Sequence, residues 1–84
     1  MTDREDPSTR IKLRAFDGPT GVTFEPLGDT VDLERDDWIT VRTDPATPFT
    51  VEIVVWPTGI SVWLPYPGQG YVVSDSKGED ILSW

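Results

Sequence analysis

Residues 49–64 read FTVEIVVWPTGISVWL, and this stretch decides the fold class. Apolar side chains occupy every second position on both sides of Pro57-Thr58-Gly59, which is the period of a β-strand. Proline sets the first dihedral of a turn and glycine tolerates positive φ, so these three residues predict a tight turn. The stretch therefore predicts a β-hairpin.

The register of this hairpin follows from which side chains share a face. A three-residue loop would pair Val54 with Val62 and Ile53 with Trp63, which mixes small and large groups on both faces. A two- or four-residue loop gathers the aliphatic side chains on one face and places Trp56 and Trp63 together on the other. We expect this segregated register, with a four-residue loop, because proline excludes the two-residue type I′ turn.

Six other segments alternate in the same way between turn-forming residues, namely 10–16, 22–25, 30–34, 38–42, 71–73 and 81–84. Asp29 could instead cap a single helical turn at the third of these. Asp75-Ser76-Lys77-Gly78 predicts a type I turn with glycine in the left-handed region. Short strands spaced by about 8–12 residues predict an all-β fold, a small antiparallel β-sandwich or partly open β-barrel of seven to eight short strands.

The chain of 84 residues is long enough for one domain. Residues 1–8 carry charges and almost no apolar side chain, which predicts a disordered acidic tail before a single β domain over residues 9–84. There is no cysteine and no histidine. Disulfides and thiolate or imidazole metal sites are therefore excluded, and stability must come from aliphatic and aromatic packing.

The net charge of −8 makes nucleic acid and anionic membranes poor partners and favours a basic protein as partner. The first residues lack the apolar region of a secretory signal, and no apolar run reaches the ~18 residues of a membrane span. We therefore expect a cytoplasmic protein without a cofactor. The sequence leaves its oligomeric state open.

The residues needed for the common catalytic mechanisms are missing. Without histidine or cysteine, a nucleophile would need a lysine or carboxylate base, and Lys12 and Lys77 lie in a strand and a turn where nothing suggests desolvation. The 15 acids make chance carboxylate pairs inevitable, so such a pair does not identify a glycosidase. No phosphate-binding glycine motif occurs. We expect no enzymatic activity.

Two charged segments have a simple structural interpretation and a functional alternative. The acids Asp29, Asp32, Glu34, Asp36 and Asp37 fall within nine residues but lack the EF-hand spacing. We interpret them as a solvated strand and turn rather than a weak cation site, and so expect no metal. The bases Arg10, Lys12 and Arg14 share one face of a strand, where we expect them to pair with Asp32, Glu34 or Glu52.

Tryptophan placement is the most informative functional feature. Trp56 and Trp63 share a face, and Trp38 aligns with polar residues of its own strand. Exposed tryptophans anchor protein interfaces and also stack on sugars, whereas in a sandwich a second layer could bury them. The predicted partner-binding residues combine the indoles with the acidic segment: Trp38, Trp56, Trp63, Asp32, Glu34, Asp36 and Asp37.

These features favour a non-enzymatic protein-interaction module. An immunity- or antitoxin-type inhibitor, a chaperone of a basic partner, and a component of a larger, phage-like assembly all fit its size and charge. The alternative is a carbohydrate-binding β module that uses exposed tryptophans.

Overall fold

The computed structural model describes residues 10–43, 50–65 and 70–84, and within these ranges every regular element is a β-strand. The expected acidic tail, residues 1–8, lies outside the described residues. The strands are β1 (Arg10–Arg14), β2 (Thr20–Glu25), β3 (Asp29–Leu33), β4 (Trp38–Thr43), β5 (Glu52–Trp56), β6 (Gly59–Trp63), β7 (Tyr71–Asp75) and β8 (Asp80–Ser83). The all-β expectation is confirmed, and the alternative helical turn after Asp29 is wrong because this segment forms β3.

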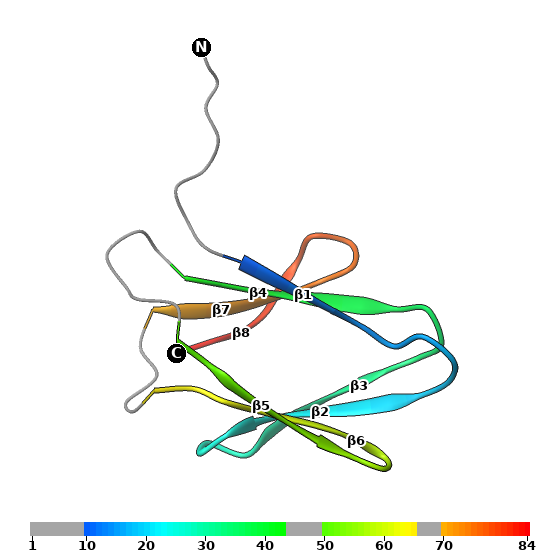
Figure 1. Ribbon diagram of the computed structural model, residues 1–84. Helices are drawn as coiled ribbons and strands as arrows, with labels where there is room; N and C mark the ends of the chain where they lie inside the picture. Colours follow the sequence, from blue (N-terminus) through cyan, green and yellow to red (C-terminus); the bar gives the residue numbers. More distant parts are fainter. Residues whose placement is uncertain (1–9, 44–49, 66–69) are drawn as a thin grey trace.

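The strands form two four-stranded sheets that pack face to face (Figure 1). Sheet A has the order β1-β4-β7-β8, and sheet B has the order β3-β2-β6-β5. The expected β-sandwich is confirmed. One pair departs from the antiparallel expectation, because β2 and β6 run parallel. These two strands are far apart in sequence, so no local turn determines their relative direction.

The hairpin formed by β5 and β6 has the segregated register. Ile53 lies opposite Val62, and Val54 lies opposite Ser61. The expected four-residue loop is wrong, since only Pro57 and Thr58 separate the two strands. Neither residue has positive φ, and neither does Gly59. Proline forbids the type I′ turn but is compatible with a two-residue turn in which both φ angles are negative.

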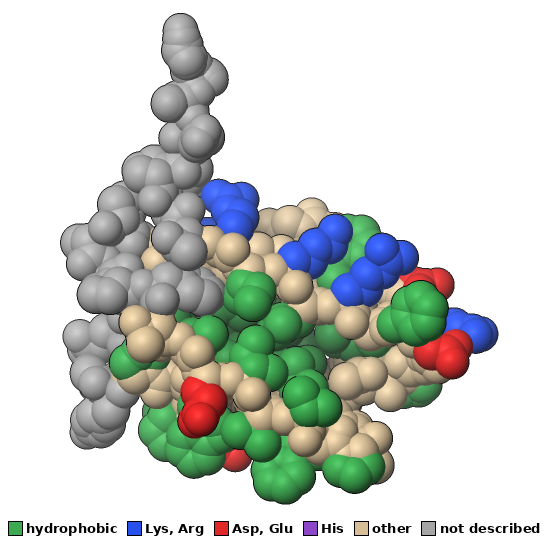
Figure 2. All heavy atoms as spheres, in the orientation of Figure 1, with side chains coloured by type: hydrophobic (Ala, Val, Ile, Leu, Met, Phe, Trp, Pro, Cys, Tyr) green, Lys and Arg blue, Asp and Glu red, His purple; other side chains and the backbone are tan. Residues whose placement is uncertain are grey.

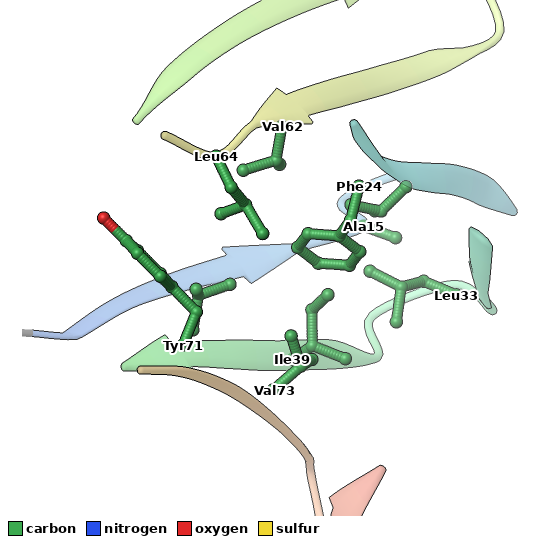
Figure 3. Close-up of a cluster of buried hydrophobic side chains, with 10 residues drawn as sticks. Ala15, Phe24, Leu33, Ile39, Val62, Leu64, Tyr71 and Val73 are labelled. Carbon is green, nitrogen blue, oxygen red and sulfur yellow. The ribbon is translucent and has the colours of Figure 1, made fainter. Parts of the chain in front are cut away.

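The core lies between the inner faces of the two sheets (Figure 3). Its buried members come from five strands and two strand-flanking positions: Ala15, Val22, Phe24, Leu33, Ile39, Val41, Val62, Leu64, Tyr71 and Val73. The Tyr71 hydroxyl accepts from the Thr50 N–H at 3.2 Å and donates to the Thr50 carbonyl at 3.4 Å. This buried phenol therefore ties β7 of sheet A to the segment that enters β5 of sheet B.

The side of the sandwich between β3 and β8 is closed by Trp84, which follows β8. Its ring lies 5.4 Å from the ring of Phe24, at an interplanar angle of 47°. Its indole Nε1 donates to the Asp29 carboxylate at 3.2 Å. The two sheets are thus joined on this side by an aromatic contact and a hydrogen bond.

The expected turns at residues 35–37 and 75–78 are confirmed. Gly78 has φ of 86°, and its N–H donates to the Asp75 carbonyl. Asp36 occupies the same left-handed region at φ 65°, which aspartate tolerates better than most residues. Among the described residues, no helix is long and apolar enough to cross a membrane.

Candidate functional site

The outer face of sheet B carries two exposed indoles. Trp56 is 55% exposed and Trp63 is 43% exposed. Both point away from the core because their neighbours Ile60, Val62 and Leu64 point into it. The second layer of the sandwich covers only the inner face, so burial of these two tryptophans, the alternative considered above, is wrong.

Two glycines form the floor of a hollow beside Trp56. Asp32, Gly21, Gly59 and Trp56 stand in one row across all four strands of sheet B. Since the two central positions have no side chain, the outer surface is low between the acid and the indole. The hollow has a volume of about 190 Å³ and is lined by Gly21, Thr23, Trp56, Thr58, Gly59, Ile60 and Ser61.

The two glycines differ in why they are needed. A Cβ on Gly59 would lie 2.5 Å from the carbonyl oxygen of Gly21, so the approach of β6 to β2 requires glycine there. A Cβ on Gly21 would find its nearest neighbour, an Asp32 oxygen, at an ordinary 3.6 Å. Glycine at position 59 is therefore required by the close approach of two strands, whereas glycine at position 21 only keeps the outer surface open.

Hydroxyl groups cross the sheet beside the hollow and hold the indole in place. The Trp56 Nε1 donates to the Ser61 hydroxyl at 2.8 Å. The hydroxyls of Thr23 and Thr30 are hydrogen bonded at 3.1 Å on the neighbouring strands. The Trp56 ring is thus fixed in orientation while more than half of its surface stays accessible.

Two carboxylate residues flank the second indole. Trp63 lies opposite Glu52 on β5 and opposite Glu25 on β2. The two indoles therefore sit on an apolar and hydroxylic surface with acids at its rim. We call this surface, made of Trp56, Trp63, Val54, Ser61, Thr23, Glu25 and Glu52, the indole face.

The outer face of sheet A has the opposite character. Four of the seven basic residues lie on it, namely Arg10, Lys12, Arg14 and Arg42. Figure 2 shows Lys and Arg side chains along the layer of sheet A, and hydrophobic side chains between the layers and along sheet B. The Lys12 ammonium sits 4.4 Å from the centre of the Trp38 ring, and Arg14 lies 3.7 Å from Asp36.

The expected pairing of the β1 bases with Asp32, Glu34 or Glu52 is wrong. Within the described ranges β1 pairs only with β4, whereas Asp32 and Glu52 belong to sheet B and Glu34 directly follows β3. Lys12 instead contacts the indole of Trp38 on β4, and Arg14 contacts Asp36 in the turn that precedes β4. The sequence alternation predicted the face of these bases but not the neighbouring strand.

A three-residue network completes the polar face of sheet A. Arg42 donates to both carboxylate oxygens of Asp80, at 3.1 and 3.2 Å, and to the Ser74 hydroxyl at 2.6 Å. Ser74 donates in turn to Asp80 at 2.7 Å. The hydrogen bonds from Arg42, and then from Ser74, hold the pKa of Asp80 below its ordinary value.

The predicted partner-binding residues do not form one site. Trp56, Trp63 and Asp32 lie on the outer face of sheet B, and Trp38 lies on the opposite side of the sandwich, on sheet A. Glu34, Asp36 and Asp37 belong to the turn between β3 and β4.

Part of that turn has a structural role. The Asp37 carboxylate accepts from the Trp38 N–H at 2.9 Å, and the Asp36 N–H donates to the Ala15 carbonyl. Among the described residues, the Asp and Glu side chains form no group of three or more that could hold a metal ion.

Sequence reasoning missed the hollow and its hydroxyls. The sequence places Gly59 in a predicted turn and Gly21 just before the segment 22–25, and only their cross-strand pairing brings them together. Comparison of the chain with protein-family models, with curated protein sequences and with solved structures finds no match.

Proposed function

We propose that the protein is a non-catalytic protein-interaction module that binds its partner through the indole face. The observation that carries this proposal is the pair of exposed tryptophans on one sheet face. Tryptophan is enriched among the residues that dominate binding energy, and a hydrogen-bonded indole loses little conformational freedom on binding. The Trp56–Ser61 bond supplies that restraint.

The rim of the indole face suits a basic partner. Glu25 and Glu52 flank Trp63, and Asp32 borders the hollow. The net charge of −8 adds a long-range attraction for positive surfaces. Charges at a rim mainly raise the association rate, whereas buried aromatic anchors slow dissociation. In this proposal the acids at the rim speed association and the two tryptophans slow dissociation.

Site-specific photo-cross-linking in the cells that encode the protein tests the proposal. A photoreactive side chain at Thr23 lies on the outer face of sheet B, and the same group at Thr40 lies on that of sheet A. We expect Thr23 to give an adduct with one defined protein, Trp63→Ala to reduce it, and Thr40 to give none. An adduct formed only from Thr40, or unaffected by Trp63→Ala, would contradict the proposed surface.

The kind of partner then decides among three finer roles. An immunity- or antitoxin-type inhibitor would form a stoichiometric complex that abolishes the partner's activity, and a chaperone would keep the partner from aggregating. A component of a phage-like assembly would instead co-purify with particles. We infer the cytoplasm as the compartment, because a chain without cysteine needs no oxidising environment.

A second candidate function, carbohydrate binding, rests on the hollow beside Trp56. A sugar ring could stack on the indole while the hydroxyls of Thr23, Thr58 and Ser61 form hydrogen bonds with the hydroxyl groups of the sugar. Titration with neutral oligosaccharides, followed by tryptophan fluorescence, tests this. A saturable change that Trp56→Ala removes would support it, and an unchanged signal at millimolar sugar would count against it.

A further inference from the structure

The four sheet edges differ in how they discourage pairing with another strand. Edge strands β1 and β3 carry charges along their length, Arg10, Lys12 and Arg14 on the first and Asp29 and Asp32 on the second. Edge strand β8 has only four residues and an irregular register with β7. Charge, shortness and irregularity are the usual protections of an edge. The fourth edge, β5, reads EIVVW and has one charge, at its first residue.

The side chains of β5 are unusually exposed for their type. Val55 is on the inner face of sheet B and yet 77% exposed, so sheet A does not cover this end of the strand. Ile53, on the same face, is 36% exposed. Figure 1 shows the β5–β6 hairpin extending away from sheet A towards its turn. An incoming strand can therefore reach β5 without meeting β1.

We propose that β5 pairs antiparallel with β5 of a second copy of this chain, with Val54 opposite Val54. This register pairs all five residues of the strand, with Ile53 opposite Val55 and Glu52 opposite Trp56. In a two-residue hairpin the pair that closes the loop, here Trp56 and Gly59, is hydrogen bonded. By alternation, the backbone N–H and C=O of Val54 also point towards β6. The backbone groups of Ile53 and Val55 point outward, so Ile53 of one copy can bond to Val55 of the other.

Charge also favours a second copy in this register. The two Glu52 residues lie at opposite ends of the new ladder, about 14 Å apart at ~3.4 Å per residue, which exceeds the ~8 Å screening length at physiological salt. The same symmetric pairing of β1 would place Lys12 opposite Lys12 and Arg10 opposite Arg14. Like charges directly opposite destabilise a pair, so β5 can pair with itself where β1 cannot.

This dimer goes beyond the proposed function and does not depend on it. A symmetric pairing of one edge closes on itself and yields a dimer rather than a fibre. It joins the two copies of sheet B into one eight-stranded sheet. The outer face of that sheet carries both indole pairs, so a partner would meet four tryptophans.

Cysteine trapping tests the dimer, because the natural chain contains no cysteine. In Val54→Cys the two thiols would face each other across the symmetry axis, at a separation that a disulfide can span. Thr30→Cys is the matched control, an exposed position on the same face but on edge strand β3. We expect mild oxidation to convert Val54→Cys almost completely to a covalent dimer and Thr30→Cys several-fold less. Equal cross-linking of both variants would overturn the register.

Light scattering of the unmodified chain gives the second measurement. We expect twice the monomer mass for the wild type, and monomer mass for Val55→Lys. Phe16→Lys is the control, since Phe16 is an equally apolar side chain, 82% exposed, outside β5, and it should remain dimeric. A monomeric wild type, or a dimer that survives Val55→Lys, would overturn the proposal. Neither result would affect the photo-cross-linking test, which reports on a different protein.

Discussion

The two outer faces of the sandwich use tryptophan in different ways. On sheet A, Trp38 lies under the Lys12 ammonium, half-buried, beside ion pairs that connect Arg14 to Asp36 and Arg42 to Asp80. On sheet B, Trp56 and Trp63 are exposed, and the neighbouring acids have no cation opposite them in the sheet. The first face pairs most of its charges internally, whereas the second leaves aromatic surface and acidic side chains exposed.

The largest expected effect separates the inner face of sheet B from its outer face. Phe24 is completely buried and contacts Trp84, so Phe24→Ala should cost about 3–5 kcal/mol of unfolding free energy. Trp63→Ala should cost less than about 1 kcal/mol, because its side chain is largely outside the core. Chemical denaturation of both variants measures the difference. A Trp63→Ala variant as unstable as Phe24→Ala would make Trp63 a core residue and remove the main support for the indole face.

The next effect compares the two glycines under the hollow. Gly59→Ala should destabilise by about 1–3 kcal/mol, since its Cβ would collide with the Gly21 carbonyl. Gly21→Ala should be neutral or slightly stabilising, because its Cβ has room and alanine loses less entropy on folding. Thermal unfolding of the two variants measures the difference in their stability. Equal destabilisation would show that the floor of the hollow is a strict requirement of the sheet at both positions.

Alternation in the sequence was sufficient to find the strands but not their neighbours. Ile60, Val62 and Leu64 point inward as the period-two pattern predicts, and the pattern located each of the eight strands to within a few residues. It did not indicate that β1 lies beside β4 or that β2 runs parallel to β6. Such pairings are set by how the whole core closes, and no short stretch of sequence contains that information.

The sequence predicted the part of the candidate site that lies on the hairpin of β5 and β6. Trp56 and Trp63 share a face because a short turn sets their register, and register is a local property. Trp38 was grouped with them because alternation put it on the polar face of its own strand, and the structure places that strand in the other sheet. The hollow depends on the pairing of Gly21 with Gly59, residues 38 positions apart in sequence, which explains why it was missed.

A smaller effect tests whether sheet A satisfies its own charges. Lys12→Gln removes the cation from the Trp38 ring and should cost about 0.5–1 kcal/mol. Lys77→Gln, in the exposed turn between β7 and β8, is the matched control and should change stability by less than about 0.5 kcal/mol. Denaturation at neutral pH compares them. If the two variants are equally stable, Lys12 contributes nothing through Trp38, and the contrast between the two faces is weaker than the geometry indicates.

The smallest effect at neutral pH, and the most specific, concerns the Arg42–Ser74–Asp80 network. Hydrogen bonds from Arg42 and Ser74 lower the pKa of Asp80 below its ordinary value of 3.8. A carboxylate with a lowered folded-state pKa contributes stability that is present above the ordinary value and lost as the pH falls through the lowered one. Wild-type stability should therefore decrease below about pH 4, in part because of this residue.

Asp80→Asn cannot ionise, so the difference in stability between it and the wild type should be constant above about pH 4 and shrink towards acid. Asp17→Asn is the control, because Asp17 also pairs with an arginine, Arg35, but on a highly exposed site. Its difference from the wild type should be small, because an exposed ion pair contributes little to stability. The measurement is the unfolding free energy of the three proteins from pH 7 to pH 2. A pH-independent difference for Asp80→Asn would show that the network stabilises sheet A by packing rather than by charge.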